Sequence, residues 1–148
     1  MDPLDQILQT LRSSSFRGFA LRKQAMEMLD TLPGYDWSGI YRMEDGVLVL
    51  DAYVGAATDH TRIEVGVGVC GTAVATGQNQ VVDDVRNLSN YLSCSVHTRS
   101  EIVVLIRDTS GQILGQIDID GHETGRFTST DEAFLEEMGK ILAERWSD

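Results

Sequence analysis

Hydrophobic residues at the start of the chain repeat with the period of an α-helix. The first four are spaced i, i+3, i+4 and i+7, which predicts an amphipathic helix. They are Leu4, Ile7, Leu8 and Leu11. After a serine triplet, a second stripe predicts another helix, which the Pro-Gly pair at 33–34 is expected to end. This second stripe consists of Leu21, Ala25, Met28, Leu29 and Leu32.

From residue 37 onward the pattern changes to the shorter period of β-strands. The predicted strands cover residues 37–43, 47–54, 62–65, 80–85, 101–106 and 112–120. Between them the chain predicts a short helix over 69–76 with Gly77 as its C-cap, and a polar surface loop over 86–100. A capping box at 129–132 is expected to start a last helix. Its apolar face consists of Phe134, Leu135, Met138, Ile141 and Leu142.

The predicted order of elements is ααβββαβββα. Turns at 44–46 and 108–111 indicate hairpins, so we expect an α+β fold with a mostly antiparallel central sheet, flanked by N- and C-terminal helices. The 148 residues fit a single domain, residues 1–148, with no internal repeat or linker.

Composition narrows the class of partner. The formal net charge of −11 disfavours nucleic acid and favours a small molecule with a cationic or zwitterionic group. The N-terminal segment does not resemble a signal peptide, and no stretch approaches the roughly 18 apolar residues of a membrane span. We therefore expect a cytoplasmic protein without a membrane partner.

Two cysteines are candidates for chemistry. Cys70 lies in a glycine-rich segment before a helix, whose positive end would favour a thiolate. The alternative is a small buried residue at a tight turn. Cys94 lies in the polar loop, where an accessible thiol has little packing role, although an incidental surface thiol would fit the same pattern. A structural disulfide is not expected without a secretion signal.

Acidic and aromatic residues alternate on the predicted strands. Asp118 and Asp120 point to one face of their strand, and Glu101 opens the strand that pairs with it. Such carboxyl groups suit a general acid or an ammonium clamp, and a solvated sheet face is the alternative. Trp37 and Tyr41 share a strand face, and the glycine between them is expected to leave a gap between aromatic walls, unless they are core residues.

These segments together resemble the free methionine-(R)-sulfoxide reductases, a family built on the GAF domain. The matching segments are residues 36–41 (DWSGIY), 66–75 (GVGVCGTAVA), 82–85 (VDDV), 100–103 (SEIV), 115–120 (GQIDID) and 125–128 (GRFT), together with Cys94. The resemblance extends from about residue 37 to the last helix.

The resemblance implies an oxidoreductase that reduces free methionine-(R)-sulfoxide and so repairs oxidative damage. It implies that Cys94 attacks the sulfoxide, that Cys70 resolves the resulting sulfenic acid as a disulfide, and that thioredoxin reduces this disulfide. Many members have a third cysteine where this chain has His60, which leaves Cys70 or an external reductant for that step. No cofactor is implied.

The same resemblance assigns the binding residues. Glu101, Asp118 and Asp120 match the acids that bind the amino group and assist proton transfer, and Trp37 and Tyr41 match the aromatic walls around the substrate methyl group. Two alternatives stay open, a GAF small-molecule sensor without chemistry and an inactive family member.

The sequence also bears on a possible zinc site and on a possible homodimer. The spacing of Cys94 and His97 is ligand-like, but their partner pair would be His60 and Cys70, which is not a familiar zinc spacing, so no metal site is expected. The amphipathic first and last helices offer surfaces for a homodimer.

Overall fold

The computed structural model describes residues 2–89 and 96–148 of the chain. Its helices are α1 (Pro3–Ser13), α2 (Gly18–Leu29), α3 (Gly68–Thr76) and α4 (Ser129–Glu144), with a short 3-10 helix over Val85–Asn87. Its strands are β1 (Trp37–Glu44), β2 (Val47–Val54), β3 (Arg62–Glu64), β4 (Gln80–Val82), β5 (Ser100–Arg107) and β6 (Ile113–Gly121). This order of elements agrees with the predicted ααβββαβββα.

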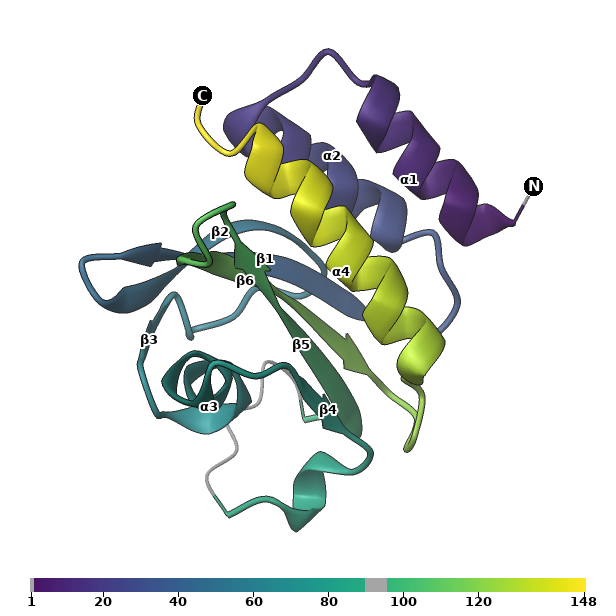
Figure 1. Cartoon of the computed structure of the whole chain (residues 1–148). Coiled ribbons are helices and arrows are strands. Elements are labelled where there is room, and N and C mark those ends of the chain that lie inside the picture. Colours follow the sequence, from purple (N-terminus) through teal and green to yellow (C-terminus); the bar gives the residue numbers. More distant parts are fainter. Residues whose placement is uncertain (1, 90–95) are drawn as a thin grey trace.

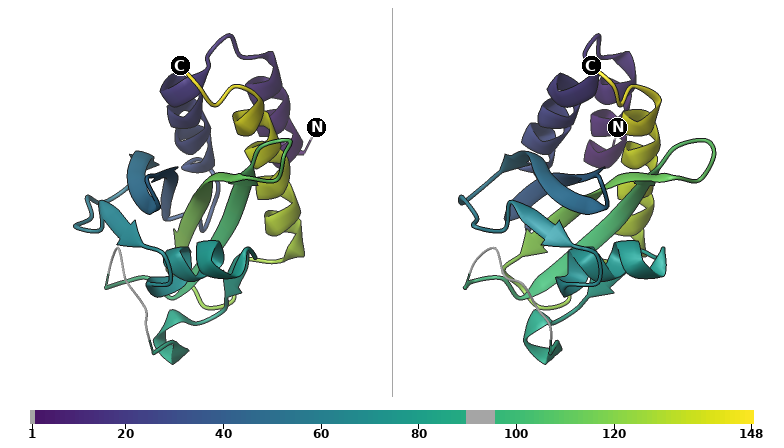
Figure 2. Two further views of the ribbon diagram at one scale, coloured as in Figure 1. Left: turned by 60° about the vertical axis from the view of Figure 1, so that its left-hand side comes forward. Right: turned by 90° about the vertical axis from the view of Figure 1, so that its left-hand side faces the viewer.

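The strands form one six-stranded sheet in the order β3-β2-β1-β6-β5-β4, and every neighbouring pair is antiparallel. Helices α2 and α4 pack on one face of the sheet, α1 packs against α2 and α4, and α3 lies on the opposite face (Figure 1). The views in Figure 2 show the same separation into layers. Among the described helices, none is both long and apolar enough to cross a membrane.

Two apolar clusters fill the two faces of the sheet. The larger lies under α1, α2 and α4 and includes Ile117 and Ile119 of β6. The smaller lies under α3 and includes Trp37, Tyr41 and Cys70. Because side chains alternate along a strand, each central strand contributes to both clusters.

The helix boundaries differ from the predicted ones at the end of α2, at the start of α3, which begins one residue early at Gly68, and at the cap of α4. Helix α2 ends at Leu29, and the chain continues in turns in which Thr31 and Leu32 donate to the carbonyls of Met28 and Leu29. The capping box of α4 begins one residue earlier than predicted, at Thr128, whose backbone N–H donates to Asp131 at 2.9 Å.

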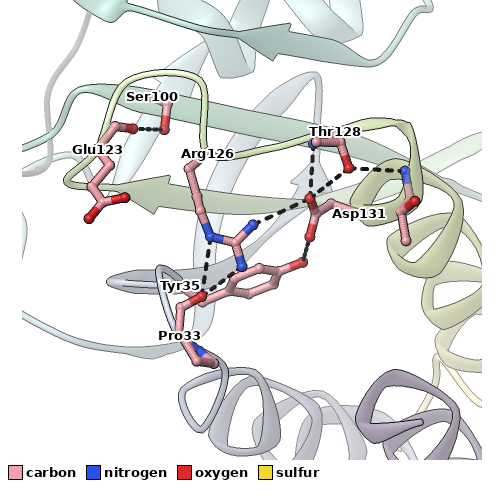
Figure 3. A network of polar contacts seen from close by, with 8 residues as sticks. Pro33, Tyr35, Ser100, Glu123, Arg126, Thr128 and Asp131 are labelled. Carbon is pink, nitrogen blue, oxygen red and sulfur yellow. Dashed lines mark hydrogen bonds and ion pairs between the residues drawn. The ribbon is translucent and has the colours of Figure 1, made fainter.

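A polar network fixes the start of α4 against the connection between α2 and β1 (Figure 3). Tyr35 donates to Asp131 at 2.7 Å, and Arg126 donates to the carbonyl of Pro33 at 2.6 Å. Burial first, and then the hydrogen bond to Asp131, raises the pKa of Tyr35 well above its usual range. The buried phenol therefore stays protonated and keeps donating.

Segment 80–100 differs from the prediction at the predicted strand 80–85, which is shorter, and at the end of the predicted loop, which is buried. Strand β4 pairs with β5 only over Gln80–Val82, and a 3-10 turn follows it. Thr98 and Ser100 are buried, and β5 already begins at Ser100, which donates to the carbonyl of Glu123 at 2.7 Å. The predicted surface loop is therefore wrong at its C-terminal end, whereas Arg86, Asn87 and Ser89 at its other end are exposed as predicted, and residues 90–95 lie outside the described part of the chain.

Candidate functional site

The sheet face under α3 gathers the predicted acids. Glu101 on β5 lies opposite Asp120 on β6, and Asp118 lies opposite Val103, so the three carboxyl groups occupy adjacent rows of one face. Their relative exposures are 3% for Glu101 and 1% for each aspartate. The prediction of a shared face is confirmed, and the alternative of a solvated face is wrong.

Helix α3 places Cys70 above these acids. The close approach of α3 to the backbone of β3 depends on Gly71, where an added Cβ would lie 2.4 Å from the carbonyl oxygen of Glu64. The Cys70 sulfur lies 3.9 Å from Oε2 of Glu101, and the ligand atoms of Cys70, Glu101 and Asp118 all lie within 4.8 Å of one another. The structure thus brings together a thiol and carboxyl groups separated by up to 48 residues of sequence.

The electrostatics of this cluster contradict the prediction that the Cys70 side chain is a thiolate. Burial first, and then the charges of Asp118, Glu101 and Asp120, raise the pKa of Cys70 well above its usual range. The dipole of α3 places a positive charge of roughly half a unit at the start of the helix, and this charge does not offset the rise in the pKa of Cys70. The predicted thiolate at Cys70 is therefore wrong for this conformation, in which the thiol is protonated.

Burial also raises the pKa of Asp118, although hydrogen bonds with Glu101 and Cys70 oppose this shift. A carboxyl group with a raised pKa is a better proton donor near neutral pH than an exposed aspartate. The cluster therefore combines a thiol with a carboxyl group suited to general-acid chemistry.

Trp37 does not leave the predicted gap over Gly39. A Cβ added to Gly39 would lie 2.3 Å from the Trp37 ring, so the indole itself covers the glycine. The ring stacks on Tyr53, with centroids 5.8 Å apart, and its Nε1 donates to the carbonyl of Ala56 at 2.9 Å. The expected space between two aromatic walls is filled by one of the walls.

A small cavity opens beside the cluster. Its lining consists of Tyr41, His60, Ile63, Val67, Gly68, Val69, Cys70, Glu101 and Asp118. About 10 Å³ is open to the centre of a water molecule, which is room for about one water. The Tyr41 hydroxyl donates to the backbone carbonyl of His60 at 2.7 Å and so ties the 55–61 loop to β1.

Comparison with known proteins identifies the family. A GAF domain model matches residues 20–146. The chain is 40% identical over 120 residues to the free methionine-R-sulfoxide reductase of Escherichia coli, covering 78% of this chain and 72% of that protein. The chain belongs to the GAF-domain free methionine-R-sulfoxide reductase family.

Solved structures of this family agree with the fold. The Neisseria meningitidis free methionine-R-sulfoxide reductase in complex with its substrate is 34% identical with a TM-score of 0.87, covering 97% of this chain and 85% of that one. The reduced Staphylococcus aureus protein is 31% identical with a TM-score of 0.89, covering 97% and 95%. The predicted resemblance and the α+β GAF fold are both confirmed.

Two residues near the cluster, the buried Gln116 and the partly buried Tyr53, were not among the predicted site residues, and one predicted residue lies outside the described part of the chain. Cys94 lies outside the described residues. Gln116 was not predicted; its side chain is fully buried and donates from Nε2 to the carbonyl of Cys70 at 3.3 Å. Its position two residues before Asp118 on the same strand was the available signal, since residues i and i+2 share a face. Tyr53, opposite Gly39 in the β1–β2 pair, was also missed.

Proposed function

We propose that this protein reduces free L-methionine-(R)-sulfoxide to methionine, with Cys94 as the attacking thiol. The observation that carries the proposal is the buried cluster of Cys70, Glu101, Asp118 and Asp120 beside a cavity on a GAF sheet. Relatives named for this activity, at 40% and 37% identity, support it. A reducing compartment such as the cytoplasm would supply the thiol reductant.

The proposed first step converts one thiol and one sulfoxide into a sulfenic acid and a thioether. The thiolate of Cys94 attacks the sulfoxide sulfur, a carboxyl group protonates the oxygen, and the sulfur–oxygen bond of the substrate breaks as Cys94 gains the hydroxyl. Methionine sulfoxide is reduced by two electrons to methionine, and Cys94 is oxidised by two electrons to the sulfenic acid. Asp118 and Glu101 are the proposed acids because both line the cavity.

Recycling would follow through a disulfide. The Cys70 thiol condenses with the Cys94 sulfenic acid, which releases one water, and the dithiol of thioredoxin then exchanges with this disulfide. The Cys70 proton must leave in this step, and the neighbouring carboxylates are the groups that can accept it.

Substrate binding would use the same face of the sheet. We propose that Glu101, Asp118 and Asp120 hold the ammonium group and the sulfoxide oxygen, and that Tyr41 and Trp37 contact the methyl group. The cavity accepts about one water, so binding an amino acid requires a wall of the cavity to move. The acids lie on the central strands β5 and β6, so the movable wall is the side formed by residues 60–70.

The test supplies the separate R and S epimers of free methionine sulfoxide, first with dithiothreitol and then with thioredoxin, and measures methionine by chromatography. We expect turnover of the R epimer alone, loss of turnover in Cys94→Ser, and a loss of at least about tenfold in Glu101→Gln. Glu27→Gln, at an exposed position on α2, is the matched control. Binding of the R epimer without turnover would contradict the proposal and indicate a sensor.

The thioredoxin arm tests recycling by itself. Cys70→Ser should keep the first turnover with dithiothreitol and lose multiple turnover with thioredoxin. Unchanged multiple turnover with thioredoxin would show that Cys70 is not the resolving thiol.

A further inference from the structure

Three potential metal ligands from three separate elements meet at the base of the cavity. The Cys70 sulfur comes from α3, and carboxylate oxygens come from Glu101 on β5 and Asp118 on β6. All three ligand atoms lie within 4.8 Å of one another, and the sulfur is 3.9 Å from Oε2 of Glu101. We propose that these three side chains form a binding site for a zinc ion in the reduced protein.

The spacing fits a tetrahedral zinc ion after a small contraction. Zinc binds thiolate sulfur at about 2.3 Å and carboxylate oxygen at about 2.0–2.2 Å, so two ligands of a tetrahedral site lie roughly 3.3–3.8 Å apart. The Cys70–Glu101 distance of 3.9 Å is already close to this range. Rotation of a carboxyl group supplies the rest, since no two of the three ligand atoms are more than 4.8 Å apart, which is roughly 1 Å beyond the range.

Asp118 gives an independent reason to expect a ligand at this place. Its side chain is 1% exposed and lines the cavity, and its Oδ1 atom has no hydrogen-bond partner among the described residues. A buried carboxylate oxygen without a partner is unfavourable, because it has lost its hydration without compensation. A cation bound at this oxygen would remove that cost.

The charge of the cavity favours a cation as well. Glu101 and Asp118 contribute carboxyl groups to its lining, Asp120 lies directly opposite Glu101, and no lysine or arginine is among the lining residues that the structure describes. A divalent ion would offset two negative charges inside a site that excludes most water. Its binding replaces the thiol proton, so one proton is released as the zinc–sulfur bond forms.

The ligand types select zinc over the hard cations. Magnesium and calcium prefer six or more oxygen ligands, whereas a thiolate sulfur favours zinc. Three protein ligands leave a fourth position for water or for the imidazole of His60, which lines the same cavity. Because the proposed function uses the same carboxyl groups for substrate, zinc would then compete with methionine sulfoxide; this consequence rests on the proposed function, and the zinc site does not.

The test uses the reduced, metal-free full chain and needs no substrate. Cobalt(II) is titrated in the absence of oxygen, the thiolate-to-cobalt absorption band is followed, and zinc is then added with a chromophoric chelator as competitor. We expect one equivalent of cobalt, a thiolate band, and displacement of the cobalt by zinc. Cys70→Ser should lose the band, and Asp118→Asn should weaken zinc binding at least about tenfold, the loss that even an outer-shell change causes.

Two control variants separate this site from other metal-binding groups. Cys94→Ser removes the other thiol, and His122→Ala breaks a surface histidine pair, His97 and His122, whose rings are 5.8 Å apart. Both should keep the band and the affinity. Absence of a thiolate band, a band that follows Cys94 instead of Cys70, or an affinity unchanged in Asp118→Asn would each overturn the proposal. Circular dichroism checks that each variant is folded, and Asp118→Asn tests the site even if Cys70→Ser does not fold.

Discussion

The sulfur of Cys70 lies 3.9 Å from Oε2 of Glu101, so a thiol on the first turn of α3 meets a carboxyl group on β5. The contact joins helix α3 to the central sheet. A protonated thiol can donate to a carboxylate, whereas a thiolate at the same place would repel it. The contact is therefore consistent with the raised pKa of Cys70.

The reactivity of Cys70 should depend on the charge of Asp118. Burial is the main cause of the raised pKa of Cys70, and the Asp118 charge is the next, so Asp118→Asn should lower this pKa and increase the thiolate fraction. A drop of one pKa unit gives about tenfold more thiolate below the pKa. Iodoacetamide labelling at pH 8, followed by mass spectrometry in a Cys94→Ser background, measures the rate at Cys70 alone.

The matched control for labelling is Asp45→Asn, which changes an exposed turn away from the cavity. It should leave the labelling rate of Cys70 unchanged. Equal rates in Asp118→Asn and Asp45→Asn would show that the Asp118 charge does not restrain the thiol.

Asp118→Asn should also stabilise the protein at neutral pH. Burial raises the pKa of Asp118 above its usual 3.8, so the native state holds this proton more tightly than the unfolded state. The stabilisation from that proton is complete below pH 3.8 and is lost as the pH rises through the native pKa. Asparagine keeps the shape without the buried charge, so we expect a gain of about 1 kcal/mol at pH 7.5.

Urea unfolding at pH 7.5 and at pH 3.5 measures this difference, because the gain should shrink at the acidic pH. Reductase turnover should fall in Asp118→Asn, because the proposed reaction uses the Asp118 carboxyl group although its buried charge destabilises the fold. A variant that is less stable at both pH values would contradict the assigned cost of the Asp118 charge.

Gly39→Ala should displace the Trp37 ring. The new Cβ would lie 2.3 Å from the indole, which is already stacked on Tyr53. Overpacking of this kind costs about 1–3 kcal/mol, and denaturant unfolding followed by tryptophan fluorescence would report both the loss and the changed ring environment. Gly139→Ala on α4 is the matched control, because its Cβ would meet its nearest neighbour at an ordinary 3.5 Å. That change should be neutral or stabilising by up to about 1 kcal/mol.

Asp51→Ala should be among the most destabilising changes outside the site. Arg22 is 5% exposed, donates to Asp51 at 2.7 Å and to the carbonyl of Trp146 at 2.6 Å, and lies 4.4 Å from the Trp146 ring centroid. Removing the carboxylate leaves a buried cation without its counter-charge, at a cost of about 3–5 kcal/mol.

Thermal and urea unfolding test this expectation against Glu137→Ala. Glu137 pairs with Lys140 at 3.1 Å on the exposed surface of α4, so its removal should cost less than about 1 kcal/mol. A similar loss in both variants would show that burial does not strengthen the Arg22–Asp51 pair.

Sequence pattern alone predicted the elements and the shared face of the two aspartates because period-two alternation is a direct consequence of strand geometry. It placed Asp118 and Asp120 on one face, and the glycine at 77 correctly ended α3, where it adopts a left-handed φ of 68°. Both features depend only on residues adjacent in sequence.

Features that depend on tertiary packing could not be predicted. The protonation of Cys70 follows from acids 31 and 48 residues away, and their effect opposes the local helix dipole. The place of the Trp37 ring follows from Tyr53 and Ala56 on and after the neighbouring strand. In both cases, long-range contacts outweighed the local signal.

The pairing of β1 with β6 at the centre of the sheet affects how the chain folds as it is made. Trp37 pairs with Asp120, and Gly39 pairs with Asp118, across about 80 residues of sequence. A nascent chain on the ribosome cannot form the β1–β6 pair until β6 has emerged from the exit tunnel. Until then no acid of β6 lies beside the Cys70 thiol. Incomplete chains therefore expose Cys70 to oxidants, whereas the folded protein buries it.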